Sequence, residues 1–227
     1  MPEAAATPLA RAFSTLLWDL KCAVGWSARS PEECVRAADA DQTIRTALLD
    51  ARFLSGEAAT CELFSRGVLP KLLTHRADAY IQEKAQELRA RREKFGDSVF
   101  LLEPNIKQGE GGLRDLETAL WIARVRFHTR GLTGLLQQSL LPESEVARLK
   151  AARDFLLRIR HHLHLLRGRK EDRLTFDLQE IASAAHERCV GKPEVAGGEP
   201  SGLQDPRQGL GEGACHLAAR HVPRLVR

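Results

Sequence analysis

The spacing of hydrophobic positions predicts helices over most of the chain. Apolar residues keep a helical period in the segments 8–21, 31–54, 57–74, 78–95, 113–131 and 142–166, and a last helix is expected over 175–185. Ser30 and Glu33 can form a capping box, with Pro31 at the first helical position, and this marks the start of the second segment. Two short runs, residues 23–29 and 98–102, are typical of strands. We therefore predict a mainly α-helical fold with a small residual β element at its N-terminal side.

The hydrophobic pattern ends at about Val190. Residues 190–227 contain 7 of the 17 glycines and 4 of the 10 prolines, and no helical or strand period continues through them. Such a composition is typical of a disordered or poorly packed tail. A natural flexible tail and a shifted reading frame both explain the change, and the sequence does not separate them.

Composition excludes several classes of protein. The net charge of +4 is too small to indicate a nucleic-acid-binding protein, and no apolar run reaches the length of a membrane span. The five cysteines are widely spaced and form no CxxC pair, which argues against a zinc knuckle or a disulfide framework. The N-terminus does not resemble a secretory signal. A reducing cytoplasm is the expected compartment.

The segment 103–115 carries the clearest chemical signal. Three glycines stand just before a predicted helix: Gly109, Gly111 and Gly112. Such a turn can present backbone N–H groups and a helix N-terminus to an anion, and Lys107 and Arg114 add two positive charges suited to phosphate oxygens. Neighbouring carboxylates could orient these bases or hold a metal: Glu103, Glu110 and Asp115. The alternative is a tight turn that glycine alone explains, with Arg114 paired to Glu103 or Asp115.

A second group of polar residues lies near the end of the long helix. His161 and His164 share a helix face, which allows metal ligation, although surface histidines without a ligand role are the commoner case. Residues 151–175 contain seven Lys/Arg and three Asp/Glu. This excess is consistent with phosphate or nucleic-acid backbone binding and equally with salt bridges inside the segment. Neither a GxSxG nor an HExxH motif is present.

These segments resemble a known family. The run 103–115, EPNIKQGEGGLRD, is similar to a signature of the bacterial PII uridylyltransferases, the bifunctional uridylyltransferase/uridylyl-removing enzymes of nitrogen regulation. Further similar segments follow in the family's order: 17–20, 24–30, 48–56, 120–123 and 168–177. The resemblance covers about residues 15–186.

The resemblance implies a nucleotidyltransferase fold joined to a helical domain. It implies transfer of UMP from UTP to a tyrosine of the PII signal protein, with Mg²⁺. Residues 1–112 would then be a remnant of the nucleotidyltransferase domain, residues 113–187 a helical domain and residues 188–227 the tail. The predicted phosphate-binding residues are Lys107, Gly109, Gly111, Gly112 and Arg114, with Glu103 and Asp115 as supporting carboxylates.

The resemblance also predicts what this chain lacks. The family's catalytic Asp-x-Asp pair belongs upstream of Leu16, and the only such spacing here, Asp39 and Asp41, falls in a predicted helix. The family's uridylyl-removing and ligand-sensing domains belong after about Ala185. We therefore assign no catalytic residue or metal ligand and expect an internal fragment that is inactive alone. A glutamine-synthetase adenylyltransferase fragment, with a related glycine loop, and a non-catalytic helical binding module are the alternatives.

Overall fold

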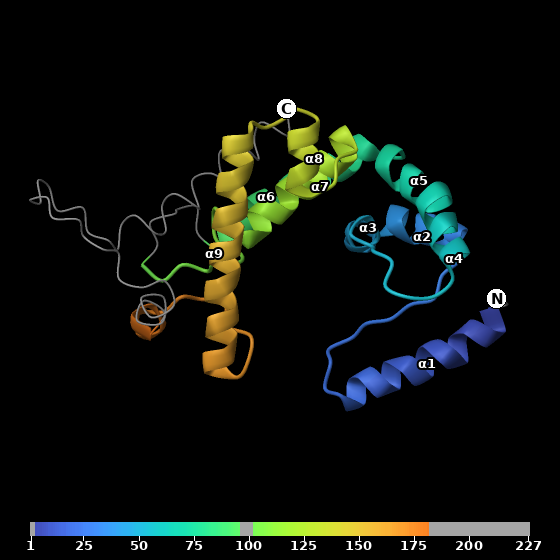
Figure 1. Ribbon diagram of the computed structural model, residues 1–227, viewed down its shortest axis with the longest axis horizontal. Helices are drawn as coiled ribbons and strands as arrows, with labels where there is room; N and C mark the ends of the chain where they lie inside the picture. The colour runs from blue at the N-terminus through green and yellow to red at the C-terminus, as the bar shows by residue number, and fades with distance from the viewer. Residues whose placement is uncertain (1–2, 96–101, 182–227) are drawn as a thin grey trace, which may run out of the picture. The chain divides into compact units, whose positions relative to one another are not determined.

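The computed structural model describes residues 3–95 and 102–181, and most of these residues are helical (Figure 1). The mainly α-helical prediction is confirmed. The chain divides into two compact units, Met1–His75 and Arg76–Arg227. This division lies inside the predicted 1–112 segment, while the predicted boundaries at 112 and 187 stay predictions. No helix in the described ranges has the length and apolar character needed to cross a bilayer.

The first unit contains five α-helices and a π-helical turn: α1 (Glu3–Asp19), α2 (Pro31–Ala40), α3 (Gln42–Leu49), α4 (Ala58–Leu63), η1 (Phe64–Val68) and α5 (Leu69–Thr74). The capping box at Ser30 and Glu33 forms as predicted. Helices α2, α3 and α5 pack together with η1 around buried Leu49 and Leu72. Arg45 of α3 fixes the end of α5 by donating to the carbonyls of Leu72 and His75, each at 2.5 Å.

Two predictions for this unit are wrong. The helix predicted over 31–54 breaks at Asp41, which has an extended backbone and caps α3 by accepting from the Thr43 N–H at 2.6 Å; α3 then ends at Leu49. A short Asp side chain competes with the helix for backbone donors in this way. Residues 23–29, predicted as a strand, have no regular structure, and the described residues contain no strand that could pair with them.

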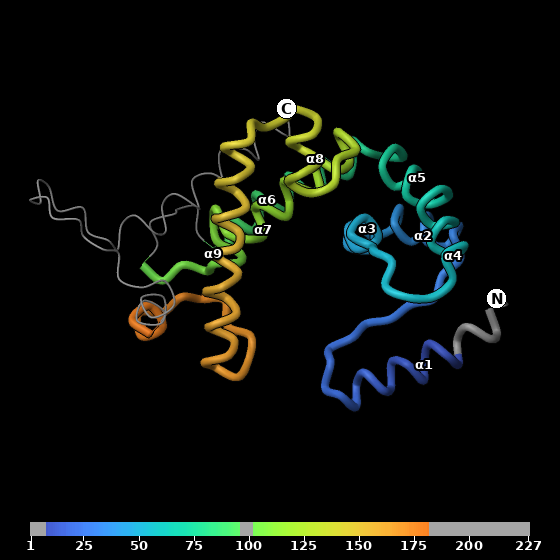
Figure 2. The backbone as a smooth tube through the Cα atoms, in the orientation of Figure 1, coloured from blue at the N-terminus to red at the C-terminus, as the bar shows by residue number. Residues whose placement is uncertain are grey.

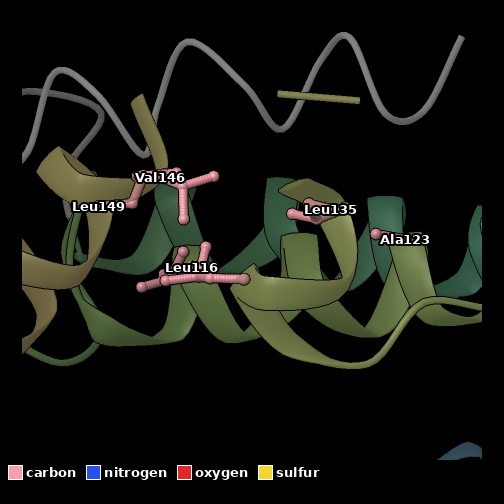
Figure 3. Packing of buried hydrophobic residues seen from close by; sticks show 6 residues of the cluster. Leu116, Ala123, Leu135, Val146 and Leu149 are labelled. Atoms are coloured by element: carbon pink, nitrogen blue, oxygen red, sulfur yellow. The ribbon is translucent and has the colours of Figure 1, made fainter. Parts of the chain in front are cut away.

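The second unit contains α6 (Ala77–Phe95), α7 (Leu113–Phe127), α8 (Gly131–Gln137), α9 (Glu143–Arg167) and a helical stretch over residues 176–181. Helix α7 contacts α6, α8 and α9. Figure 2 shows the path of the backbone from α6 to α9. One core joins α7, α8 and α9 (Figure 3): Leu116, Ala123, Leu132, Leu135, Val146 and Leu149. A second core joins the glycine segment to α9: Ile106, Leu113, Leu156, Leu163 and Leu178.

The structure adds one helix to the prediction for this unit. Helix α7 ends at Phe127, with His128 in the left-handed region (φ 54°), and Gly131 begins α8 instead of only closing the preceding helix. The stop of α9 at Gly168 (φ 61°) is confirmed. In the described ranges the only β pairing is an isolated antiparallel bridge between Asn105 and Arg173. The strand predicted over 98–102 lies outside the described residues except for Leu102, as does the predicted tail 190–227.

Candidate functional site

The two segments with the clearest chemical signals, 103–115 and 168–177, lie side by side. Their backbones are joined by two hydrogen bonds and one bridge: Ile106 N–H to Asp172 O (2.9 Å), Leu174 N–H to Pro104 O (2.9 Å), and Asn105 with Arg173. Side chains strengthen the junction, since Glu103 pairs with Arg173 at 3.0 Å and accepts from the Phe176 N–H at 3.1 Å. Residues far apart in sequence therefore form one local structure.

The glycine turn is tightly closed on itself. Its N–H groups donate to acceptors within the same segment: Gly109 to Asn105 O, Gly111 to Asp115 Oδ2, Gly112 to Gly109 O, Leu113 to Ile106 O and Arg114 to Lys107 O. Gly111 has φ 71°, and a Cβ on Gly112 would lie 2.9 Å from two backbone oxygens. Glycine is thus required for the packing of the turn. Because these amides already have acceptors, the predicted phosphate contacts would have to come from the side chains.

Arg114 lies on the first turn of α7 and faces along that helix. Its guanidinium is 3.0 Å from Glu117 and its Cζ is 5.3 Å from the centroid of the Trp121 ring. The alternative prediction, in which Arg114 pairs with Glu103 or Asp115, is wrong about both partners. The Nζ of buried Lys84, from α6, lies 5.1 Å from the centroid of the same ring. The Glu117 pair is exposed enough to contribute little stability, so Arg114 can exchange it for another anion.

The charge of Lys107 acts on the carboxylate of Asp172. Asp172 accepts from Arg160 Nε at 2.6 Å and is 3.3 Å from His164 Nε2, both on α9. Burial raises the pKa of the Asp172 carboxyl, but the hydrogen bonds from Arg160 and His164 and the charges of Arg160 and Lys107 outweigh it, so the pKa lies below its ordinary value of 3.8. In the described part of the chain, Lys107 makes no salt bridge of its own within 4 Å.

Asp115 is the most deeply buried charge of the site. It is fully buried and accepts from Arg91 Nη2 at 2.5 Å, from Arg92 Nη2 at 3.4 Å and from the Gly111 N–H at 3.0 Å. The sequence reasoning missed both arginines. A signal was present, because positions 91 and 92 continue the apolar stripe of α6 between Leu88 and Phe95, where a charged residue needs a buried partner.

The carboxylates described here do not fit a Mg²⁺ site. Arg91 and Arg92 contact the two oxygens of Asp115, and Glu103 pairs with Arg173 through Oε2 and accepts from the Phe176 N–H through Oε1, so arginine already balances the charge of each carboxylate. In the first unit, Asp41 caps α3 and Asp39 lies 3.2 Å from His75 Nδ1. The described residues contain no group of three or more His, Cys, Asp or Glu arranged to hold a metal. His164 pairs with Asp172, and His161 is exposed.

Several arginines of the basic segment 151–175 form salt bridges with carboxylates inside and outside the segment. Arg160 pairs with Asp172 (2.6 Å) and Arg169 with Glu171 (3.9 Å) inside the segment, whereas Arg167 pairs with Asp177 (2.6 Å) and Arg173 with Glu103 (3.0 Å) outside it. The predicted salt bridges inside the segment are therefore present in part, and the other two arginines join the segment to its neighbours.

Known proteins similar to this chain were found at the level of sequence. Residues 79–191 match the family described as GlnD PII-uridylyltransferase. A bifunctional uridylyltransferase/uridylyl-removing enzyme of Erythrobacter litoralis is 43% identical over 164 residues, or 72% of this chain and 18% of the relative. The enzyme of the same name from Methylococcus capsulatus is 43% identical over 187 residues, or 82% and 21%. The chain thus spans about a fifth of these relatives' length. No solved structure matches.

Proposed function

The chain belongs to the PII-uridylyltransferase family over residues 79–191, and we propose that it is part of an enzyme that transfers UMP from UTP to a tyrosine of the PII signal protein. One observation supports this proposal with particular residues. The two segments that resemble the family most clearly, 103–115 and 168–177, fold against each other and leave Lys107 beside their junction. Several charged side chains are buried to hold this one turn. Such an arrangement is more typical of a binding site than of a simple connection between two helices.

In this proposal Lys107 and Arg114 contact the phosphates of UTP. Lys107 is partly exposed beside the turn, and Arg114 can leave its exposed pair with Glu117 for a phosphate oxygen. Gly109, Gly111 and Gly112 shape the turn, and α7 directs the positive end of its dipole toward it. Glu103 and Asp115 hold the turn through their arginines. We assign no Mg²⁺ ligand and no catalytic step to this chain.

The proposal places the chain in the cytoplasm. Cys22, Cys34 and Cys61, the cysteines in the described ranges, are all free thiols. Of the alternatives, a glutamine-synthetase adenylyltransferase fragment would favour ATP over UTP. A purely structural helical module would bind neither nucleotide.

Calorimetric titration of the 227-residue chain with UTP tests the proposal. Each charged contact to phosphate is worth about 1.5–3 kcal/mol, so Lys107→Ala and Arg114→Ala should each weaken UTP binding about tenfold or more. Arg148→Ala, which removes an exposed arginine of α9, is the matched control and should leave binding unchanged. Absence of UTP binding, preference for ATP, or equal affinities in Lys107→Ala and Arg148→Ala would contradict the proposal.

A further inference from the structure

A cavity of about 720 Å³ opens beside the junction of segments 103–115 and 168–177. This volume lies within the range of small-molecule sites, about 300–1,000 Å³. Its apolar lining comes from three parts of the second unit: Phe95 at the end of α6, Leu102 before the glycine segment, and Phe176 after the turn that follows α9. Phe176 is 56% exposed and Leu102 is 75% exposed, so both present apolar surface that the described chain does not cover.

Two polar residues of the cavity lining, Asn105 and Glu103, form hydrogen bonds within the protein and have further hydrogen-bonding capacity for a ligand. Asn105 Oδ1 accepts from the Lys107 and Gln108 N–H groups at 3.1 and 2.7 Å, which fixes the amide and directs its NH₂ group the other way. Glu103 is held by Arg173 and by the Phe176 N–H, and a carboxylate has further lone pairs to accept with.

We propose that this cavity binds the uridine part of a nucleotide, with the pyrimidine stacked on Phe176. The inference rests on the proposed function and names where its nucleotide binds. The cavity therefore binds the nucleoside, while Lys107 contacts the phosphates.

The chemistry of the lining matches a nucleoside in three respects. An exposed aromatic ring offers a stacking surface, and stacking of one base on such a ring contributes about 1–3 kcal/mol in proteins that bind single-stranded nucleic acids. The Asn105 NH₂ group can donate to a pyrimidine carbonyl, and the Glu103 carboxylate can accept from a ribose hydroxyl. Lys94, also in the lining, adds a positive charge close to Phe95, its Nζ lying 5.6 Å from that ring centroid.

The cavity and Lys107 are close enough for one nucleotide to use both. Asn105 lines the cavity, and the Lys107 N–H donates to its side chain. Residues two apart in sequence have Cα atoms no more than about 7 Å apart. The glycine turn does not compete for this role, because its N–H groups already donate to acceptors within the segment.

Two separate ligands distinguish the cavity from the phosphate contacts. Uridine reports the cavity alone, and inorganic tripolyphosphate reports the phosphate contacts alone. In NMR titrations of the full chain, Phe176→Ala should weaken uridine binding about tenfold and leave tripolyphosphate binding unchanged. Lys107→Ala should do the reverse. Phe176→Trp, which keeps an aromatic ring, should retain uridine binding.

A matched control and the contrary outcomes complete the test. Phe53 of the first unit is 53% exposed, so Phe53→Ala removes an equally exposed phenyl ring from another place. Absence of uridine binding at millimolar concentrations, or equal uridine affinities in Phe176→Ala and Phe53→Ala, would overturn the cavity proposal. The proposed function would survive either result if UTP binding still depended on Lys107. Conversely, if UTP binding did not depend on Lys107 while uridine still bound, only the assignment of Lys107 to the phosphates would be rejected.

Discussion

At the scale of single residues, buried charges hold the glycine turn. Asp115 has no exposed surface, and its carboxylate meets two guanidinium groups and one backbone N–H. A buried ion pair adds little stability compared with apolar residues, but loss of one partner is costly because the other charge stays buried. Arg91 and Arg92 differ in this respect, since Arg91 is almost fully buried and Arg92 is 21% exposed.

The first prediction compares these two arginines. Arg91→Met should lower the free energy of unfolding by about 3–5 kcal/mol, because it leaves the buried Asp115 charge with the longer contact to Arg92 as its only cationic partner among the described residues and the Gly111 N–H as a neutral donor. Arg92→Met should cost about 1 kcal/mol, as expected for a partly solvated pair. Urea unfolding followed by circular dichroism measures both. Equal losses in the two variants would show that Asp115 does not depend mainly on Arg91.

The second prediction concerns Asp172 and pH. Since the pKa of Asp172 in the folded chain lies below its ordinary value of 3.8, the unfolded chain binds the proton more tightly. The stability that the carboxylate contributes is therefore complete well above pH 3.8 and is lost as the pH falls through the folded pKa. Asp172→Asn should cost about 1–2 kcal/mol at pH 7. Unfolding measured at pH 7 and pH 3 should show this cost shrinking at pH 3, and a cost independent of pH would contradict the assignment.

At the scale of elements, local sequence signals predicted the ends of helices well. Gly168 ends α9 and the Ser30 capping box begins α2, because both depend on residues within a few positions. Helix α8 could not be predicted in this way. Gly131 and Gly134 are poor helix formers, and burial of Leu132 against α7 and α9 outweighs their cost.

The same limit applies to the candidate site. The sequence identifies the glycine turn, Lys107 and Arg114 from adjacent residues. It does not give their neighbours, because the partners of Asp115 come from α6 and those of Asp172 from α9. Salt bridges between elements depend on tertiary packing, and a sequence pattern shows only that a buried charge needs some partner.

The third prediction concerns the glycine turn as an element. Gly112 has φ −73°, which any residue can adopt, but a Cβ there would lie 2.9–3.0 Å from backbone oxygens of Ile106, Lys107 and Gly109. Gly112→Ala should therefore destabilise the second unit by about 1–3 kcal/mol or more, as overpacking does. Gly25→Ala is the matched control, since nothing lies within 4 Å of its Cβ position. Thermal unfolding should shift for Gly112→Ala alone, and a shift of the same size in Gly25→Ala would count against this account.

At the scale of the whole molecule, apolar side chains are buried unevenly. Helices α7, α8 and α9 bury continuous cores, whereas α1 exposes most of its large apolar residues: Leu9, Phe13, Leu16 and Trp18. Exposed apolar surface of this extent is typical of a contact surface. The cores around α7, α8 and α9 and the candidate site therefore lie together in the second unit, which also contains the residues 79–191 that match the family.

The last prediction concerns catalysis by the whole chain. In the transfer of UMP, the negative charge of the reacting phosphates must be neutralised. Metal ions held by carboxylates would supply this stabilisation, which is worth several kcal/mol. The candidate carboxylates of the described residues are otherwise engaged: Asp39 with His75, Asp41 as a helix cap, and Glu103 and Asp115 with arginines. We therefore expect this chain, given radiolabelled UTP, Mg²⁺ and a PII protein, to label PII no more than a blank without the chain. UTP binding by the same preparation shows that the protein is folded. Labelling that requires the chain and disappears in Asp39→Asn or Asp41→Asn would prove the expectation wrong and identify the first unit as catalytic.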